Sequence, residues 1–111
     1  MKILLVEDTE MVSKLIIISL EELNHNIILA ETGEDAIQKF SNESFDLVIC
    51  DGMLPDITGA EVVKSLREKS NVPIISHSNT PEHNTAMMKN GATYEIEKSS
   101  VQNLVNFISK L

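Results

Sequence analysis

The sequence predicts an α/β protein in which a five-stranded parallel sheet carries helices on both faces. Five short apolar runs occur along the 111 residues, and each is followed by a longer segment whose apolar residues have helical spacing. The runs do not alternate between apolar and polar residues, which is typical of strands that helices bury on both faces. The crossovers between successive strands should be right-handed.

The five expected strands are rich in β-branched and other apolar residues. They cover residues 3–6, 27–30, 47–50, 72–75 and 93–96. The fourth is short and is followed by the polar residues Ser76, His77 and Ser78, and the fifth is the weakest. Each strand is expected to lead into a helix.

Each expected helix begins at a residue that can cap its first turn. The expected caps are Thr9, Thr32, Thr58, Thr80 and Ser99. Thr58 forms a capping-box pattern with Glu61, and Gly91 can end the fourth helix because glycine tolerates a left-handed backbone. The inner face of the first helix is expected to consist of Val12, Leu15, Ile16, Ser19 and Leu23.

Composition limits the classes of protein that this chain can belong to. With 42% hydrophobic and 23% charged residues, the chain should form one folded domain over residues 1–111. Its single cysteine, Cys50, rules out an intramolecular disulfide, and no apolar run is long enough for a signal peptide or a membrane span. The formal charge of −8 argues against nucleic-acid binding. We therefore expect a cytoplasmic protein without nucleic-acid or membrane partners.

Five polar residues follow the expected strands at the edge where parallel sheets bind ligands. Glu7 and Asp8 follow the first strand, Asp51 the third, Ser78 the fourth and Lys98 the fifth. Three carboxylates at one edge repel each other unless a cation is present, and Mg²⁺ suits a site with few carboxylates and several waters. A carboxylate nucleophile with an ammonium and a hydroxyl nearby is suited to phosphoryl transfer.

Four segments in this order resemble the response-regulator receiver domain, the phosphoacceptor module of two-component signalling. They are ILLVED at 3–8, DGMLPDITG at 51–59, PII at 73–75 leading to Ser78, and Gly91-Ala92 leading to Lys98. The resemblance covers essentially the whole chain. It implies the flavodoxin-like receiver fold with strand order 2-1-3-4-5.

The resemblance also implies a role for each matching residue. Asp51 would be the phosphorylated aspartate, and Ser78 and Lys98 would contact the phosphoryl group. Mg²⁺ would be held by Glu7, Asp8, Asp51 and the backbone carbonyl of Met53. The chain would be a phosphoacceptor of a two-component or phosphorelay system, and no enzyme beyond slow Mg²⁺-dependent self-phosphorylation from a phosphodonor and autodephosphorylation. Its partners would be a sensor histidine kinase or a histidine phosphotransfer protein, and a downstream protein target. Because the last helix ends near Leu111, we expect a stand-alone receiver.

The chain departs from the family pattern in three places. Glu95 stands where the family usually has an aromatic residue that turns inward on activation, and Ser99 replaces a common proline. Ser76 shares a strand face with Ser78, so it is a second candidate for the hydroxyl. These departures motivate the alternative that the chain is a pseudo-receiver, a protein-interaction module that works without phosphorylation.

Two further classes fit less well. A haloacid-dehalogenase-type phosphatase needs a second aspartate two residues after the nucleophile, where this chain has Met53. A flavin-binding module needs a hydroxyl-rich phosphate loop after the first strand, where this chain offers only Thr9, and aromatic residues to hold the ring, which are scarce.

Overall fold

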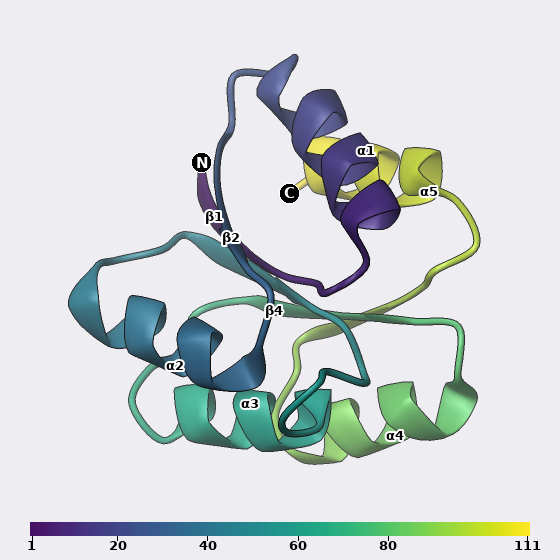
Figure 1. The fold of residues 1–111 in the computed structure, drawn as a ribbon. Helices are drawn as coiled ribbons and strands as arrows, with labels where there is room; N and C mark the ends of the chain where they lie inside the picture. Colours follow the sequence, from purple (N-terminus) through teal and green to yellow (C-terminus); the bar gives the residue numbers. More distant parts are fainter.

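Five parallel strands in the order β2-β1-β3-β4-β5 form the centre of the molecule (Figure 1). The structure, a computed structural model, describes residues 1–111. The strands are β1 (Lys2–Val6), β2 (Asn26–Ala30), β3 (Leu47–Cys50), β4 (Ile74–Ser78) and β5 (Tyr94–Glu97). The helices are α1 (Glu10–Glu21), α2 (Gly33–Asn42), α3 (Gly59–Arg67), α4 (Pro81–Lys89) and α5 (Val101–Ser109). The predicted fold class and strand order are confirmed.

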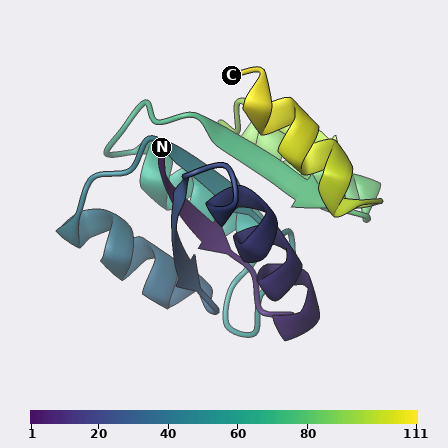
Figure 2. The same cartoon turned by 90° about the horizontal axis from the view of Figure 1, so that it is seen from above.

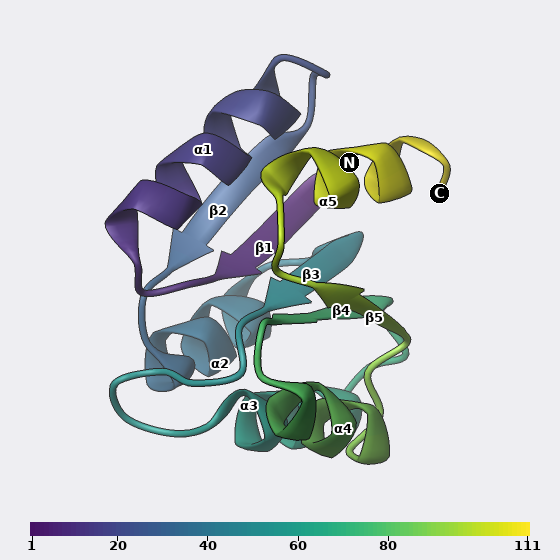
Figure 3. The ribbon, with the colours of Figure 1, turned by 90° about the vertical axis from the view of Figure 1, so that its right-hand side faces the viewer.

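The helices form one layer on each side of the sheet. Figure 3 shows α1 and α5 over one face and α2, α3 and α4 over the other. Although α1 and α5 lie at opposite ends of the sequence, they pack side by side, as the view from above also shows (Figure 2). The strand order places β1, the first strand of the sequence, inside the sheet between β2 and β3.

Two separate hydrophobic cores hold these layers to the sheet. The core under α2, α3 and α4 includes Leu4, Val48 and Met87, and the core under α1 and α5 includes Leu5, Ile16 and Leu104. Neighbouring residues of one strand thus enter opposite cores, because successive side chains of a strand point to opposite faces. This explains why the central strands are apolar without alternation.

The expected inner face of the first helix was only partly right. Ile16 is buried, but Leu15 and Leu23 are 52% and 46% exposed, and the residues that α1 buries are Ser13, Ile16 and Leu20. The helix contains so many apolar residues that more than one stripe of helical spacing can be drawn through it. The sheet buries only one of these stripes.

Two boundaries also differ from the sequence-based predictions. β4 continues through the polar residues Ser76, His77 and Ser78, all of which are buried. The cap of α5 is Ser100, whose hydroxyl accepts a hydrogen bond from the Asn103 backbone, and not Ser99. The expected helix end at Gly91 is confirmed by its φ of 114°.

The caps of the other four helices agree in position with the prediction but not always in bonding. The capping box of Thr58 and Glu61 is formed, and the Thr32 hydroxyl accepts from the backbone of Asp35. Thr9 and Thr80 occupy their predicted cap positions, but their side chains make no capping hydrogen bond.

Candidate functional site

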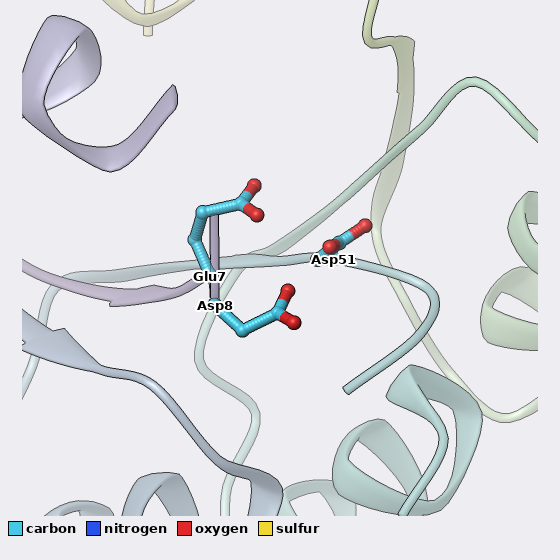
Figure 4. A group of neighbouring side chains, drawn as sticks. All are labelled: Glu7, Asp8 and Asp51. Atoms are coloured by element: carbon cyan, nitrogen blue, oxygen red, sulfur yellow. The ribbon is translucent and has the colours of Figure 1, made fainter. Parts of the chain in front are cut away.

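The parallel sheet brings three carboxylates to its carboxyl edge. Glu7 and Asp8 follow β1, and Asp51 follows β3, the neighbouring strand in which Cys50 is paired with Val6. One oxygen from each carboxylate lies within 4.8 Å of the others, and Figure 4 shows the three groups converging. Their convergence is therefore a direct result of strand order and register.

Lys98 places its ammonium among these carboxylates. It follows β5, and its Nζ lies 2.5 Å from Glu7 Oε1 and 3.3 Å from Asp51 Oδ2. The Lys98 side chain is 16% exposed, and those of Glu7 and Asp51 are 1% and 13% exposed. The site is thus partly shielded from water, and it holds three acidic groups against one ammonium.

Burial and mutual attraction shift the protonation of this pair. Burial raises the pKa of Glu7, and the hydrogen bond from Lys98 only partly opposes this. Burial would lower the pKa of Lys98, but the hydrogen bond to Glu7 and the attraction of Asp51 raise it overall. The lysine therefore remains a cation. Burial makes the Glu7 carboxyl group harder to ionise, and a divalent ion beside it would favour the ionised form.

Asp51 is held at the start of the loop that joins β3 to α3. Its Oδ1 accepts a 2.7 Å hydrogen bond from the backbone of Gly52, and its own N–H donates to the Val6 carbonyl. Met53 lies two residues further on, where it forms an isolated bridge with Thr58. Oxygen ligands from carboxylates suit Mg²⁺, so the donor set of this edge fits the ion. That the Met53 carbonyl joins this set stays a prediction.

The end of β4 supplies a hydroxyl at the same edge of the sheet as Lys98. Ser78 is the last residue of the strand, and its carbonyl accepts from the backbone of Lys98 at 3.3 Å. Ser76 lies two residues inside the strand, where its hydroxyl bonds to Asn84 of α4. Of the two candidate serines, Ser78 is thus the one at the edge of the sheet.

His77 is the residue of this region that sequence reasoning missed. The expected fourth strand ended before this residue, at position 75, but the imidazole is 2% exposed and its Nε2 has no hydrogen-bond partner. It lines a cavity of about 260 Å³ together with Lys98 and residues of α1 and the start of α5. Burial, followed by the nearby Lys98 charge, lowers its pKa to about 4, so the ring is neutral at pH 7. Polarity alone gave no signal of this burial.

Cys50 is a small buried residue, in keeping with its place in the expected strand 47–50. It is fully buried in the core under α2, α3 and α4, and burial, followed by the charge of Asp51, raises the pKa of its thiol. A thiol with a raised pKa is a poor nucleophile.

Comparison with known proteins agrees with this geometry. Residues 3–109 match the family described as response regulator receiver domain. The chain belongs to the receiver domain family. Members of this family act in two-component signalling, generally as signalling rather than catalytic domains, and receiver domains partner with histidine kinases.

Several relatives of this receiver domain are longer proteins. It is 35% identical over 106 residues to the uncharacterized transcriptional regulatory protein YrkP of Bacillus subtilis, an alignment that covers 93% of this chain and 46% of the relative. It is 41% identical over 68 residues to the alkaline phosphatase synthesis transcriptional regulatory protein PhoP of the same organism, covering 61% of this chain and 28% of the relative. The chain thus spans less than half the length of these relatives.

Solved structures share the whole architecture. The chemotaxis response regulator CheY4 of Vibrio cholerae has a TM-score of 0.90 at 26% identity, covering 98% of this chain and 96% of CheY4. The receiver domain of the Francisella response regulator 1452 has a TM-score of 0.87 at 24% identity, with 98% and 93% covered, and shows the fold alone. None of the helices in our receiver domain is both long enough and apolar enough to span a bilayer.

Proposed function

We propose that this receiver domain accepts a phosphoryl group on Asp51 in a Mg²⁺-dependent reaction. The observation that carries the proposal is the meeting of three carboxylates within 4.8 Å of one another, with the Lys98 ammonium 3.3 Å from Asp51. Of the two carboxylates that contact Lys98, Glu7 is 1% exposed, whereas Asp51, which follows the central strand β3, is 13% exposed, so Asp51 is the one that we assign as the nucleophile.

The step is a displacement at phosphorus. A carboxylate oxygen of Asp51 attacks the phosphorus of a phosphohistidine, a new P–O bond forms, and the P–N bond breaks, with its electron pair leaving on the imidazole. Lys98 pairs with a phosphoryl oxygen, and the Ser78 hydroxyl donates a hydrogen bond to another. Glu7, Asp8, Asp51 and the Met53 carbonyl would hold Mg²⁺, which supplies positive charge against the carboxylates and the phosphoryl oxygens.

A small phosphodonor tests this proposal without knowledge of the partner. We expect the protein to gain the mass of one phosphoryl group when it is incubated with acetyl phosphate and Mg²⁺, and the Asp51→Asn variant to gain none. Asp46→Asn is a matched control, because Asp46 lies at the opposite end of β3 and bonds the Lys2 backbone. An unchanged wild-type mass would contradict the proposal.

A pseudo-receiver is the second candidate, and the position of Glu95 favours it. Glu95 is exposed on β5, opposite Ser76, so it does not turn inward where the family's aromatic residue would. A domain that works only as an interaction module would show neither an adduct with acetyl phosphate nor a response to beryllofluoride, a mimic of the phosphoryl group.

The donor of the phosphoryl group is proposed to be a sensor histidine kinase or a histidine phosphotransfer protein. Three large apolar side chains of α1 support a docking surface next to the site: Met11, Leu15 and Ile18 are 75%, 52% and 56% exposed. They lie on one face of the helix, because they are four and three residues apart. α1 begins two residues after Asp8, so a partner on this surface lies beside the carboxylates.

A further inference from the structure

The helix α4 is tied to the end of β4 by one buried side chain, Asn84. This residue is 4% exposed, and its Nδ2 donates a 2.9 Å hydrogen bond to the Ser78 carbonyl. Its Oδ1 accepts a hydrogen bond from the Ser76 hydroxyl. A carbonyl can only accept, so the amide nitrogen must face Ser78 and the amide oxygen must face Ser76. The carboxamide therefore has one possible orientation, with both of its ends bonded.

The backbone carbonyl that Asn84 holds is also bonded from the other side. The backbone N–H of Lys98 donates to the same Ser78 carbonyl at 3.3 Å. Ser78 thus connects α4, through Asn84, with the residue that carries the ammonium of the site. A shift of Ser78 would change both hydrogen bonds.

The orientation of the Ser78 hydroxyl is fixed by residues at the start of α4. Its Oγ accepts a 3.0 Å hydrogen bond from the backbone of Thr80, the cap of α4. The backbone of Thr80 is in turn bonded to that of Asn84, whose N–H donates to the Thr80 carbonyl. Asn84 therefore contacts, directly or through one residue, each group that fixes the orientation of Ser78.

This bonding pattern exceeds what satisfying the Ser76 hydroxyl would require. A buried amide costs free energy unless all its polar atoms are bonded, and an apolar pair at positions 76 and 84 would avoid that cost. The second contact, to Ser78, gives the amide a role beyond core packing. A misplacement of a reacting group by about 1 Å can slow a reaction about 100-fold. The position of Ser78 therefore matters for the chemistry.

We propose that Asn84 is a positioning residue of the phosphoryl site, which fixes the Ser78 hydroxyl toward the incoming phosphoryl group and transmits movement of Ser78 to α4. The proposal rests on the proposed function of Asp51 as phosphoacceptor. Asn84 itself does not contact the phosphoryl group, and it leaves the carboxylates of the metal site untouched.

A double-mutant cycle tests this role. Asn84→Leu replaces the amide by an apolar side chain of similar size, and we expect phosphorylation by acetyl phosphate to slow by about 10-fold. Mg²⁺ affinity, measured by titration, should stay unchanged. In a Ser78→Ala background, which lacks the hydroxyl, Asn84→Leu should cause no further slowing, because the group that it positions is gone. Thr85→Ala, at the exposed neighbouring position of α4, is the control and should react like the wild type.

A second measurement follows the connection to α4. With beryllofluoride and Mg²⁺, the backbone amide resonances of residues 82–89 should shift in the wild type and in Thr85→Ala, and should shift much less in Asn84→Leu. If Asn84→Leu does not fold, Ser76→Ala removes one anchor of the amide and should show both effects more weakly.

The possible outcomes are distinct. Equal slowing by Asn84→Leu with and without the Ser78 hydroxyl would overturn the proposal, because the residue would then act on stability alone. An unchanged rate in Asn84→Leu would overturn it as well. A wild-type protein that takes up no phosphoryl group would overturn the proposed function together with this inference, whereas normal uptake with additive effects would overturn only the role of Asn84.

Discussion

At the scale of single residues, His77 carries a buried ring nitrogen that makes no hydrogen bond. The ring of His77 is buried, and it lines the same cavity as Lys98. Its Nε2 has no hydrogen-bond partner. Burial penalises the charged imidazolium, and the nearby Lys98 ammonium adds to this penalty. This explains why the pKa of His77 falls from 6.5 to about 4.

The lowered pKa predicts how stability depends on pH. The unfolded chain binds a proton at His77 below pH 6.5, whereas the folded protein does so only below about 4. The contribution is therefore fully present above pH 6.5 and is lost as the pH falls toward 4, by up to about 3 kcal/mol. Urea unfolding at several pH values in this window gives the free energy of unfolding as a function of pH. The slope of this free energy against pH should be smaller for His77→Leu than for the wild type. Equal slopes would contradict the burial of a neutral ring.

The residues of the site differ in how far the sequence alone could predict them. Glu7, Asp8, Asp51 and Lys98 could be placed together, because strand order and parallel pairing determine which residues meet at the carboxyl edge. Asn84 and His77 could not. Whether a polar residue is buried depends on the element that packs over it, and β4 was expected to end before its polar residues.

At the scale of elements, α1 shows the limit of periodicity. Residues 15–18 are all apolar, so both the buried stripe through Ile16 and the exposed stripe through Leu15 have helical spacing. Packing against α5 and the sheet selects the first stripe. The second remains exposed as Met11, Leu15 and Ile18, a surface that a monomer without partners would not need.

This surface predicts a difference between two phosphodonors. Replacing Met11, Leu15 and Ile18 by serine should slow transfer from a phosphorylated histidine phosphotransfer protein at least about 10-fold, because each lost apolar contact weakens the docked complex. Uptake from acetyl phosphate, which needs no docking surface, should be unchanged. Glu21→Ser, on the exposed last turn of the same helix, serves as the control. Equal slowing with both donors would show that α1 acts on the site and not on docking.

The loop that joins β3 to α3 is held by two hydrogen bonds from the first turn of α2. The Asp56 carboxylate accepts hydrogen bonds from the backbone N–H groups of Gly33 and Glu34, at 2.8 and 2.9 Å, and these bonds lower its pKa. They satisfy N–H groups in the first turn of α2 that have no partner within the helix. The loop that begins at Asp51, the proposed phosphoacceptor, is therefore anchored to a neighbouring helix.

At the scale of the whole molecule, the sheet holds the residues of the candidate site at the carboxyl ends of its strands. Two cores, one on each face, fix the strands in register, so the carboxylates are held together despite their repulsion. The protein carries a formal charge of −8, and three of its acidic groups are concentrated at this edge. A fold that places these charges so close together is suited to a site that binds a divalent cation and transfers an anion.

The location of the phosphoryl group tests this account most directly. The protein is treated with acetyl phosphate in the presence of Mg²⁺ or of a chelator, and fragments of it are analysed by mass spectrometry. We predict a single adduct on the fragment that contains Asp51, present with Mg²⁺ and nearly absent with the chelator. An adduct on another residue, or equal labelling without the metal, would contradict it.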